Sequence, residues 1–143
     1  MIAPFNEKQL TPNGYDLAIK EIEVAGQIME PKEIDGKRIV VIPPMKRFII
    51  LTKEKLIMPP TVMALLAVKT KRARIGVFLS PGFIDAGFIG QLNLCCLNAD
   101  DAPINIDIDA TFVQVVFPML TRGADKVYAQ RSGNYQNQNK IMK

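Results

Sequence analysis

The chain has 143 residues, of which 48% are apolar and 22% charged, and its formal net charge at pH 7 is +4. This length fits one domain, and a chain of this size buries enough surface to hold a core without disulfides or a structural metal. The composition is that of an ordinary globular protein, which excludes disorder along the whole chain. Because the sequence contains no histidine, it excludes Ser-His-Asp and Cys-His catalysis and His-ligated zinc or iron.

No apolar run approaches the ~18 residues that a membrane-spanning helix needs. The first ten residues, MIAPFNEKQL, also lack the basic region and the apolar core of a signal peptide. We therefore expect a cytoplasmic protein with no membrane partner, or a component of a virus particle assembled in the cytoplasm. Cys95 and Cys96 are adjacent, and neighbours on a strand point to opposite faces, so we expect two reduced thiols.

Short apolar alternations among ten prolines and nine glycines predict an all-β domain. The first clear strand covers residues 15–24. Its apolar side chains keep one phase up to Ile19 and take the opposite phase from Ile22 onward. Since side chains alternate with a period of two along a strand, this change of phase predicts a bulge near Lys20.

The rest of the barrel region carries further strand patterns, over residues 38–42, 47–52, 61–70, 74–79, 89–98, 103–109 and 110–120. Pro43 and Pro44 predict a turn between the first two of these strands. Residues 61–70 could be taken for a helix, but the prolines at 59 and 60 and the shortness of the run favour a strand. Many short strands at close spacing are typical of a sandwich, a jelly roll or a distorted barrel.

The composition changes after Arg122. Residues 123–143 are polar and rich in Asn and Gln, so we expect a domain over residues 1–122 followed by a tail that orders on a ligand or on a neighbouring subunit. We find neither an internal repeat nor an inter-domain linker.

Positive charge is densest in the segment KTKRAR at residues 69–74. A cluster of this kind is a candidate anion site, although a solvated basic edge explains it nearly as well. The pattern argues against nucleic acid as a partner, because no aromatic side chains alternate with the cations.

Four segments in order resemble the dCTP deaminase family. They are the opening PFNEKQLTPNGYDL (4–17), the basic segment LLAVKTKRARIGV (65–77), the segment GFIDAGFIGQLNL (82–94), which trimeric dUTPases share in looser form, and VYAQRSGNYQNQ (127–138). The resemblance implies a homotrimer of distorted β-barrels or jelly rolls of the dUTPase-like type, with nucleotide sites at the subunit interfaces. It also implies that Mg²⁺ accompanies the triphosphate, with no zinc and no organic cofactor. Family members deaminate dCTP, split dUTP to dUMP and diphosphate, or do both.

The resemblance assigns roles to particular positions. Asp85 matches the aspartate that receives the sugar 3′-hydroxyl and positions the attacking water, although a turn aspartate is the simpler explanation. Phe88 takes the aromatic position beside the sugar, or is simply core. Arg74 matches an arginine that holds the triphosphate, a task that suits the guanidinium fork. The family's Arg-Ser-Ser corresponds here to Lys69, Thr70 and Lys71.

Two positions depart from the family pattern. Cys95 stands where deaminases carry the glutamate that moves protons, and a thiol with a reference pKa near 8.5 is a poor substitute for a carboxylate. Asn134 stands where the tail motif carries a lysine, while Tyr128, Tyr135 and Gln138 still match. We also note Gly14 in place of the serine that is common before Tyr15.

These departures leave two hypotheses open. The first is a nucleotide hydrolase that converts dUTP to dUMP and diphosphate, with deamination of dCTP weak or lost; dTTP is a further candidate ligand. The second is a catalytically inactive homotrimer of the same fold, used as a nucleotide sensor or as a structural component of a larger assembly.

Overall fold

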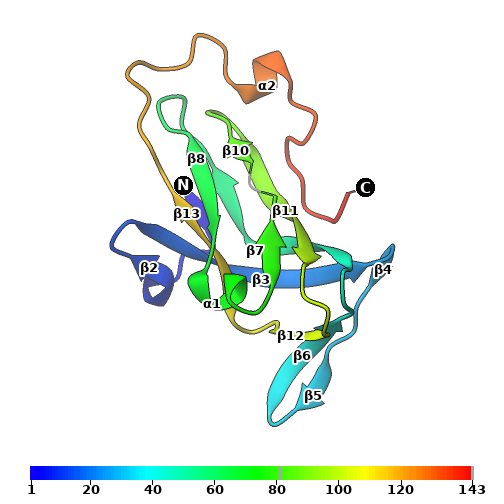
Figure 1. Ribbon diagram of the computed structural model, residues 1–143. Helices are drawn as coiled ribbons and strands as arrows, with labels where there is room; N and C mark the ends of the chain where they lie inside the picture. The colour runs from blue at the N-terminus through cyan, green and yellow to red at the C-terminus, as the bar shows by residue number, and fades with distance from the viewer. Residues whose placement is uncertain (81, 143) are drawn as a thin grey trace.

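The computed structural model describes residues 1–80 and 82–142, and the chain is mostly β (Figure 1). The strands are β1 Ile2–Ala3, β2 Leu10–Thr11, β3 Gly14–Val24, β4 Gln27–Ile28, β5 Lys32–Ile34, β6 Lys37–Ile42, β7 Arg47–Ile57, β8 Ala64–Val68, β9 Val77–Leu79, β10 Phe83–Ile84, β11 Ile89–Asn98, β12 Ile104–Asp107 and β13 Thr111–Val116. The helices are a 3₁₀ turn at Glu7–Gln9, α1 at Thr70–Ala73 and α2 at Tyr128–Arg131. Along the described chain, no helix is long and apolar enough to cross a membrane.

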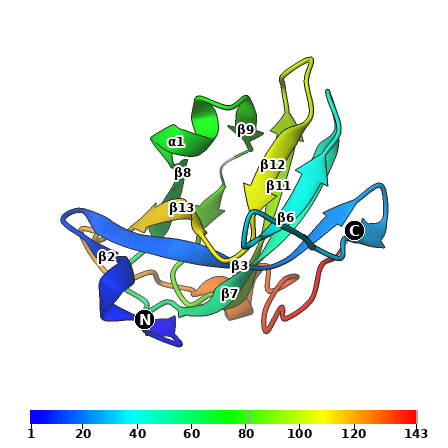
Figure 2. The ribbon, with the colours of Figure 1, turned by 90° about the horizontal axis from the view of Figure 1, so that it is seen from below.

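Most strands form one curled antiparallel sheet in the order β10-β8-β13-β3-β7-β11-β9, to which β1, β2 and β4 add short pairings. A smaller sheet, β12-β6-β5, lies at the lower end of the molecule in Figure 1. Seen from below, the long strand β3 crosses the molecule (Figure 2). The predicted all-β class, with its strands curled into a barrel-like sheet, is thereby confirmed for a single chain.

The predicted bulge in β3 is confirmed. Ile19 pairs with Thr52, while Glu21 pairs with Leu51, so Lys20 is an extra residue without a partner on β7. The extra residue shifts the alternation by one position. The apolar side chains before and after the bulge therefore all point to the core, although they occupy odd positions up to Ile19 and even positions from Ile22.

The core lies between the inner face of the main sheet and the apolar residues of the smaller sheet. Its largest fully buried side chains are Tyr15, Phe48, Phe112, Leu17, Ile22, Ile42, Ile50, Leu51, Leu56 and Ile106. The smaller sheet therefore closes one end of the curled main sheet.

The structure corrects some predicted boundaries. The strand predicted over 74–79 begins only at Val77, because the preceding residues form the short helix α1 and a turn. The strand predicted over 110–120 ends at Val116, and Met119 is 79% exposed. Residues 61–70 do form a strand, over the shorter range of β8. The two strands around Pro43 exist, but they belong to different sheets.

Two hairpins were absent from the sequence prediction. The β3–β4 turn holds Ala25 and Gly26 at φ values of 52° and 88°, and the β5–β6 turn holds Asp35 and Gly36 at 50° and 71°. Two consecutive residues with positive φ make the turn type that matches strand twist, and Asp-Gly is a strong sequence signal for it. The β5–β6 hairpin was therefore readable from the sequence.

Candidate functional site

A cavity of about 680 Å³ opens between β7, β11, the β9–β10 region and the C-terminal tail. Six of the predicted site residues line it: Asp85, Phe88, Cys95, Tyr128, Tyr135 and Gln138. Its other described lining residues include Arg47, Ile49, Ser80, Asn93, Asn134 and Met142. With Leu66 of β8, residues from four separate parts of the chain meet around one cavity.

Asp85 starts the turn between β10 and β11. The backbone N–H of Phe88 donates to the carbonyl of Asp85 at 3.1 Å, which closes the turn. The Asp85 side chain is exposed, and its carboxylate accepts no hydrogen bond from any described residue. Asp85 is therefore a turn residue, and its carboxylate is also accessible to a ligand in the cavity.

Phe88 was expected either to line the nucleotide pocket or to belong to the core. In the structure it is a core residue that also lines the cavity. Its ring packs edge-on against Tyr128 with centroids 5.6 Å apart. The backbone N–H of Tyr128 donates to the carbonyl of Ala86 at 2.9 Å. The aromatic pair therefore joins the Asp85 turn to the beginning of α2.

Cys95 lies in the middle of β11, half-buried on the same face as Gln91 and Asn93. It pairs with Ile49 of β7, which places both side chains on the cavity side of the sheet. Cys96 points to the core, and both cysteines are free thiols, as predicted. Burial, with a smaller contribution from Cys95, raises the pKa of the Cys96 thiol far above its ordinary value.

The tail forms one wall of the cavity through hydrogen bonds to the first half of β11. The N–H of Gln91 donates to the carbonyl of Gln138 at 2.8 Å, and the Gln138 Nε2 donates to the carbonyl of Gln91 at 2.7 Å. The N–H of Asn137 donates to the carbonyl of Ile89 at 2.7 Å. Further along, the Asn93 Nδ2 donates to the carbonyl of Lys140 at 3.1 Å. The tail is therefore attached to its own chain largely through the backbone of β11.

Two glycines permit this close approach. A Cβ on Gly87, whose φ is +83°, would lie 2.5 Å from the Cβ of Val127. A Cβ on Gly90 would lie 3.1 Å from the backbone nitrogen of Gln138. Each glycine thus makes room for a tail residue as well as fitting the family motif.

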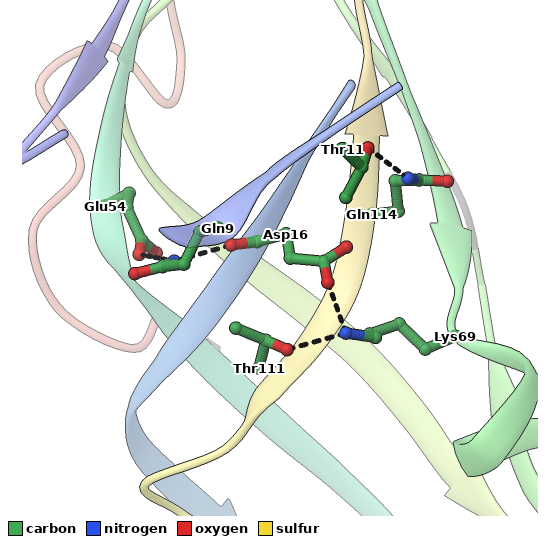
Figure 3. Close-up of polar contacts among 7 residues, drawn as sticks. All are labelled: Gln9, Thr11, Asp16, Glu54, Lys69, Thr111 and Gln114. Carbon is green, nitrogen blue, oxygen red and sulfur yellow. Dashed lines mark hydrogen bonds and ion pairs between the residues drawn. The ribbon is translucent and has the colours of Figure 1, made fainter. Parts of the chain in front are cut away.

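The predicted phosphate-binding residues lie elsewhere. Lys69, Thr70, Lys71 and Arg74 are absent from the cavity lining. Lys69 precedes α1 and forms an ion pair with Asp16 of β3 (Figure 3), whereas the other three side chains are exposed. Within one chain, the structure does not bring the basic segment to the cavity.

Sequence reasoning missed Arg47, which is the one Lys or Arg among the described residues that line the cavity. It pairs with Leu97 on the Cys95 face of β11. The alternation of Arg47 with Ile49 was the available signal, but it gains meaning only when β7 and β11 are known to be neighbours. Gly14 also has a structural explanation, since a Cβ there would lie 2.0 Å from the carbonyl oxygen of Val115.

The acidic and sulfur side chains of the described residues do not gather into a metal site. No group of three or more Cys, Asp or Glu side chains is placed to hold an ion along residues 1–80 and 82–142. A second cavity of about 660 Å³, near the N-terminus, is mainly apolar and contains none of the predicted site residues.

Comparisons with known proteins agree with this architecture. The profile of the family described as dCTP deaminase-like matches residues 1–120. The dCTP deaminase of Pyrococcus horikoshii is 36% identical over 143 residues, which are 99% of this chain and 88% of the relative. That of Thermococcus gammatolerans is 35% identical over 142 residues, covering 99% and 87%. A dUMP-forming dCTP deaminase of Aquifex aeolicus is 33% identical over 136 residues, covering 90% and 73%.

Solved structures share the fold at lower identity. The dCTP deaminase of Agrobacterium tumefaciens superposes with a TM-score of 0.64 at 18% identity, over 83% of this chain and 43% of that one. A mutant dUTPase from phage phi11 of S. aureus superposes with a TM-score of 0.62 at 17% identity, over 88% and 94%. The profile match over residues 1–120 and the relatives at 35% and 36% identity along nearly the whole chain show that the chain belongs to the dCTP deaminase-like family.

Proposed function

We propose that the protein binds a pyrimidine deoxynucleoside triphosphate in the cavity beside β11 and hydrolyses dUTP to dUMP and diphosphate, with deamination of dCTP weak or lost. One observation carries this proposal. Asp85 and Cys95 line the same cavity, and Asp85 is the only Asp or Glu among its described lining residues.

Asp85 is suited to orient a water molecule for attack on a phosphate. Its carboxylate is exposed to the cavity, and an ionised carboxylate can accept two hydrogen bonds and polarise the water that donates them. The turn that carries it is fixed by its own hydrogen bond and by the Phe88–Tyr128 pair. The site therefore has a group for activating water.

Deamination needs a second group that gives and takes protons at the ring. Cys95 occupies the position where the family carries that glutamate, and Ile49 beside it offers no replacement. Loss of a general acid-base group typically costs about 10² to 10⁴ in rate. We therefore expect hydrolysis of the amino group to suffer most from this substitution.

Binding of the triphosphate requires more positive charge than Arg47 supplies. In the proposed homotrimer, α1 of a neighbouring subunit would bring Lys71 and Arg74 to the open side of the cavity, and the guanidinium would bind phosphate oxygens in a bidentate way. Mg²⁺ would be held mainly by the phosphates, because the described residues form no site of their own for it.

Relatives support both chemistries in this family. The archaeal relatives are named dCTP deaminases, the Aquifex relative is named dUMP-forming, and the phage phi11 structure, which shares the fold, is a dUTPase. These names supply no support for the alternative of a structural role in a particle. They do support a pyrimidine nucleotide as the ligand.

The first experiment incubates the purified protein with Mg²⁺ and dUTP or dCTP and separates the products by ion exchange. We expect dUMP from dUTP, and its loss in the variant Asp85→Asn. Asp125→Asn is the matched control, since Asp125 is an exposed tail carboxylate outside the cavity lining. Hydrolysis that survives in Asp85→Asn would overturn the role of Asp85.

A second experiment replaces the thiol. Cys95→Glu restores the carboxylate of the family, so ammonia release from dCTP should rise by roughly 10² or more if the rest of the deaminase site is intact. Cys95→Gln, of nearly the same shape but without charge, is the control. Equal rates in the two variants would mean that more than Cys95 separates this protein from a deaminase.

The competing proposal is a nucleotide-binding homotrimer without catalysis. It is favoured by Cys95 and Asn134, which line the cavity where the resemblance places a glutamate and a lysine. It predicts binding of dUTP, dCTP or dTTP in calorimetry without turnover. Native mass spectrometry tests the trimer that both proposals require, and a monomer at micromolar concentration would count against each.

A further inference from the structure

Lys69 is held by contacts inside the chain. Its ammonium group forms an ion pair with the carboxylate of Asp16 on β3 and donates to the Thr111 Oγ1 on β13 at 2.7 Å (Figure 3). The Lys69 side chain is 31% exposed and that of Asp16 only 15%. An ion pair shielded to this degree holds its two partners more firmly than a surface pair does.

The position of Lys69 in the chain makes this contact important for α1. Its carbonyl accepts the N–H groups of Arg72 at 2.7 Å and Ala73 at 3.1 Å, so the helix begins directly at this residue. The side chain at the same residue is tied to β3 and β13. The start of the basic segment is thereby fixed to the main sheet.

Arg72 fixes the other end. The residue as a whole is 6% exposed, and its guanidinium lies 5.5 Å from the centroid of the Phe112 ring on β13. One guanidinium nitrogen donates to the carbonyl of Asp107 at 3.4 Å. Of the four cations in the segment, two are therefore used for attachment, and Lys71 and Arg74 are left exposed.

We infer that Lys69 is a positioning residue, which acts through Asp16 to hold α1 so that Lys71 and Arg74 are presented to the triphosphate of a bound nucleotide. This inference rests on the proposed nucleotide site for its functional part. It differs from the role that the resemblance gives this position, because two of the three N–H donors of the Lys69 ammonium group are already used on Asp16 and Thr111.

The two roles predict opposite results for Asp16→Asn. If Lys69 contacts phosphate directly, removal of Asp16 frees the ammonium group and deletes a negative charge, so affinity rises. If Lys69 holds α1, the same change releases the helix and affinity falls. We expect the Kd for a nonhydrolysable imido analogue of dUTP with Mg²⁺ to rise about tenfold, as for one lost charge-assisted hydrogen bond.

The charge-swapped variant Asp16→Lys with Lys69→Asp tests the pair itself. A positioning pair is restored by the swap, so the Kd should return to within about threefold of the wild-type value. A lysine that binds phosphate is not restored when an aspartate takes its place. Lys69→Arg keeps the charge and should also stay near wild type. Tighter binding by Asp16→Asn, or no rescue in the swap, would overturn the inference.

Limited trypsin digestion supplies a readout that needs no nucleotide. Asp16→Asn should speed cleavage after Lys71 and Arg74, because α1 loses its attachment. Asp109→Asn is the matched control, since it breaks the Arg38–Asp109 ion pair, whose side chains are each 58% exposed. Equal cleavage of α1 in both variants would refute the attachment. Absence of nucleotide binding in the wild type would instead refute only the proposed function.

Discussion

The cavity wall and the basic segment are held in place by different kinds of contact. The wall is built from β11 and the tail. They are joined by two bonds between backbones, Asn137 N–H to the Ile89 carbonyl and Gln91 N–H to the Gln138 carbonyl, and by side-chain bonds such as that of Gln138. The basic segment, residues 69–74, contains the four-residue helix α1 and is attached through two side chains, Lys69 and Arg72. Contacts between backbones survive most substitutions, whereas side-chain contacts do not.

This difference decides which positions can be substituted without the loss of an attachment. Cys95 and Asn134 stand where the resemblance places a glutamate and a lysine, and neither makes one of the bonds that attach the tail. The basic segment has less freedom, because substitution at Lys69 or Arg72 removes the attachment itself. The four predictions that follow test the comparison, beginning with the largest effect.

Phe112→Ala should have the largest effect, because it removes a fully buried ring from the core and from beneath Arg72. We expect a loss of about 3–5 kcal/mol in the free energy of unfolding, measured with urea. Trypsin should also cleave α1 faster at denaturant concentrations where the protein is still folded. Phe112→Leu keeps most of the volume and should lose less than half as much stability. Unchanged cleavage of α1 in Phe112→Ala would show that Arg72 does not hold the helix.

Gly87→Ala tests the wall. The new Cβ would clash with Val127, and the alanine would have to keep a backbone φ of +83°. We therefore expect the free energy of unfolding to fall by roughly 1–2 kcal/mol and trypsin to cleave faster after Arg131. Gly36→Ala is the control, because its φ is +71° but nothing lies within 4 Å of the added Cβ. Its loss of stability should reflect only the unfavourable φ and no clash. Equal protection of Arg131 in the two variants would contradict a tail docked through Gly87.

The two cysteines of the wild-type protein should differ in their rate of alkylation. Cys95 lines the cavity, whereas burial raises the pKa of the Cys96 thiol and keeps it protonated and shielded. Iodoacetamide at pH 8 should therefore label Cys95 first, as measured by mass spectrometry. Saturating dUTP should slow the labelling. Preferential labelling of Cys96 would mean that the β11 face is assigned incorrectly.

The substitution Asp100→Asn should have the smallest effect, a pH-dependent change in melting temperature. Asp100 follows β11 and lies against Gly76, just after the basic segment, and hydrogen bonds from the Ala102 N–H and from Asp101 lower its pKa. A carboxyl with a lowered pKa stabilises the fold above its unfolded-state pKa, and this contribution disappears as pH falls through the folded-state value. The melting temperatures of wild type and Asp100→Asn should therefore differ at pH 7 and converge in acid. A gap that widens in acid would contradict this sign.

The sequence alone determined the class of fold and most of the cavity wall. Alternation with a period of two is a local property, so it located the strands, the bulge at Lys20 and the polar face that carries Cys95. The order of the four motifs identified the family and the residues Asp85 and Phe88. It also predicted that Cys95 takes the place of the deaminase glutamate.

Only the tertiary structure decided which of these residues meet. Lys69 and Asp16 are 53 positions apart in the sequence, and they meet because β13 lies between β3 and β8 in the sheet. Arg47 reaches the cavity because β7 pairs with β11, and the tail closes it because Gly87 and Gly90 leave room. Local periodicity carries no information on the order of strands in a sheet. The partners of the charged side chains therefore became known only with the fold.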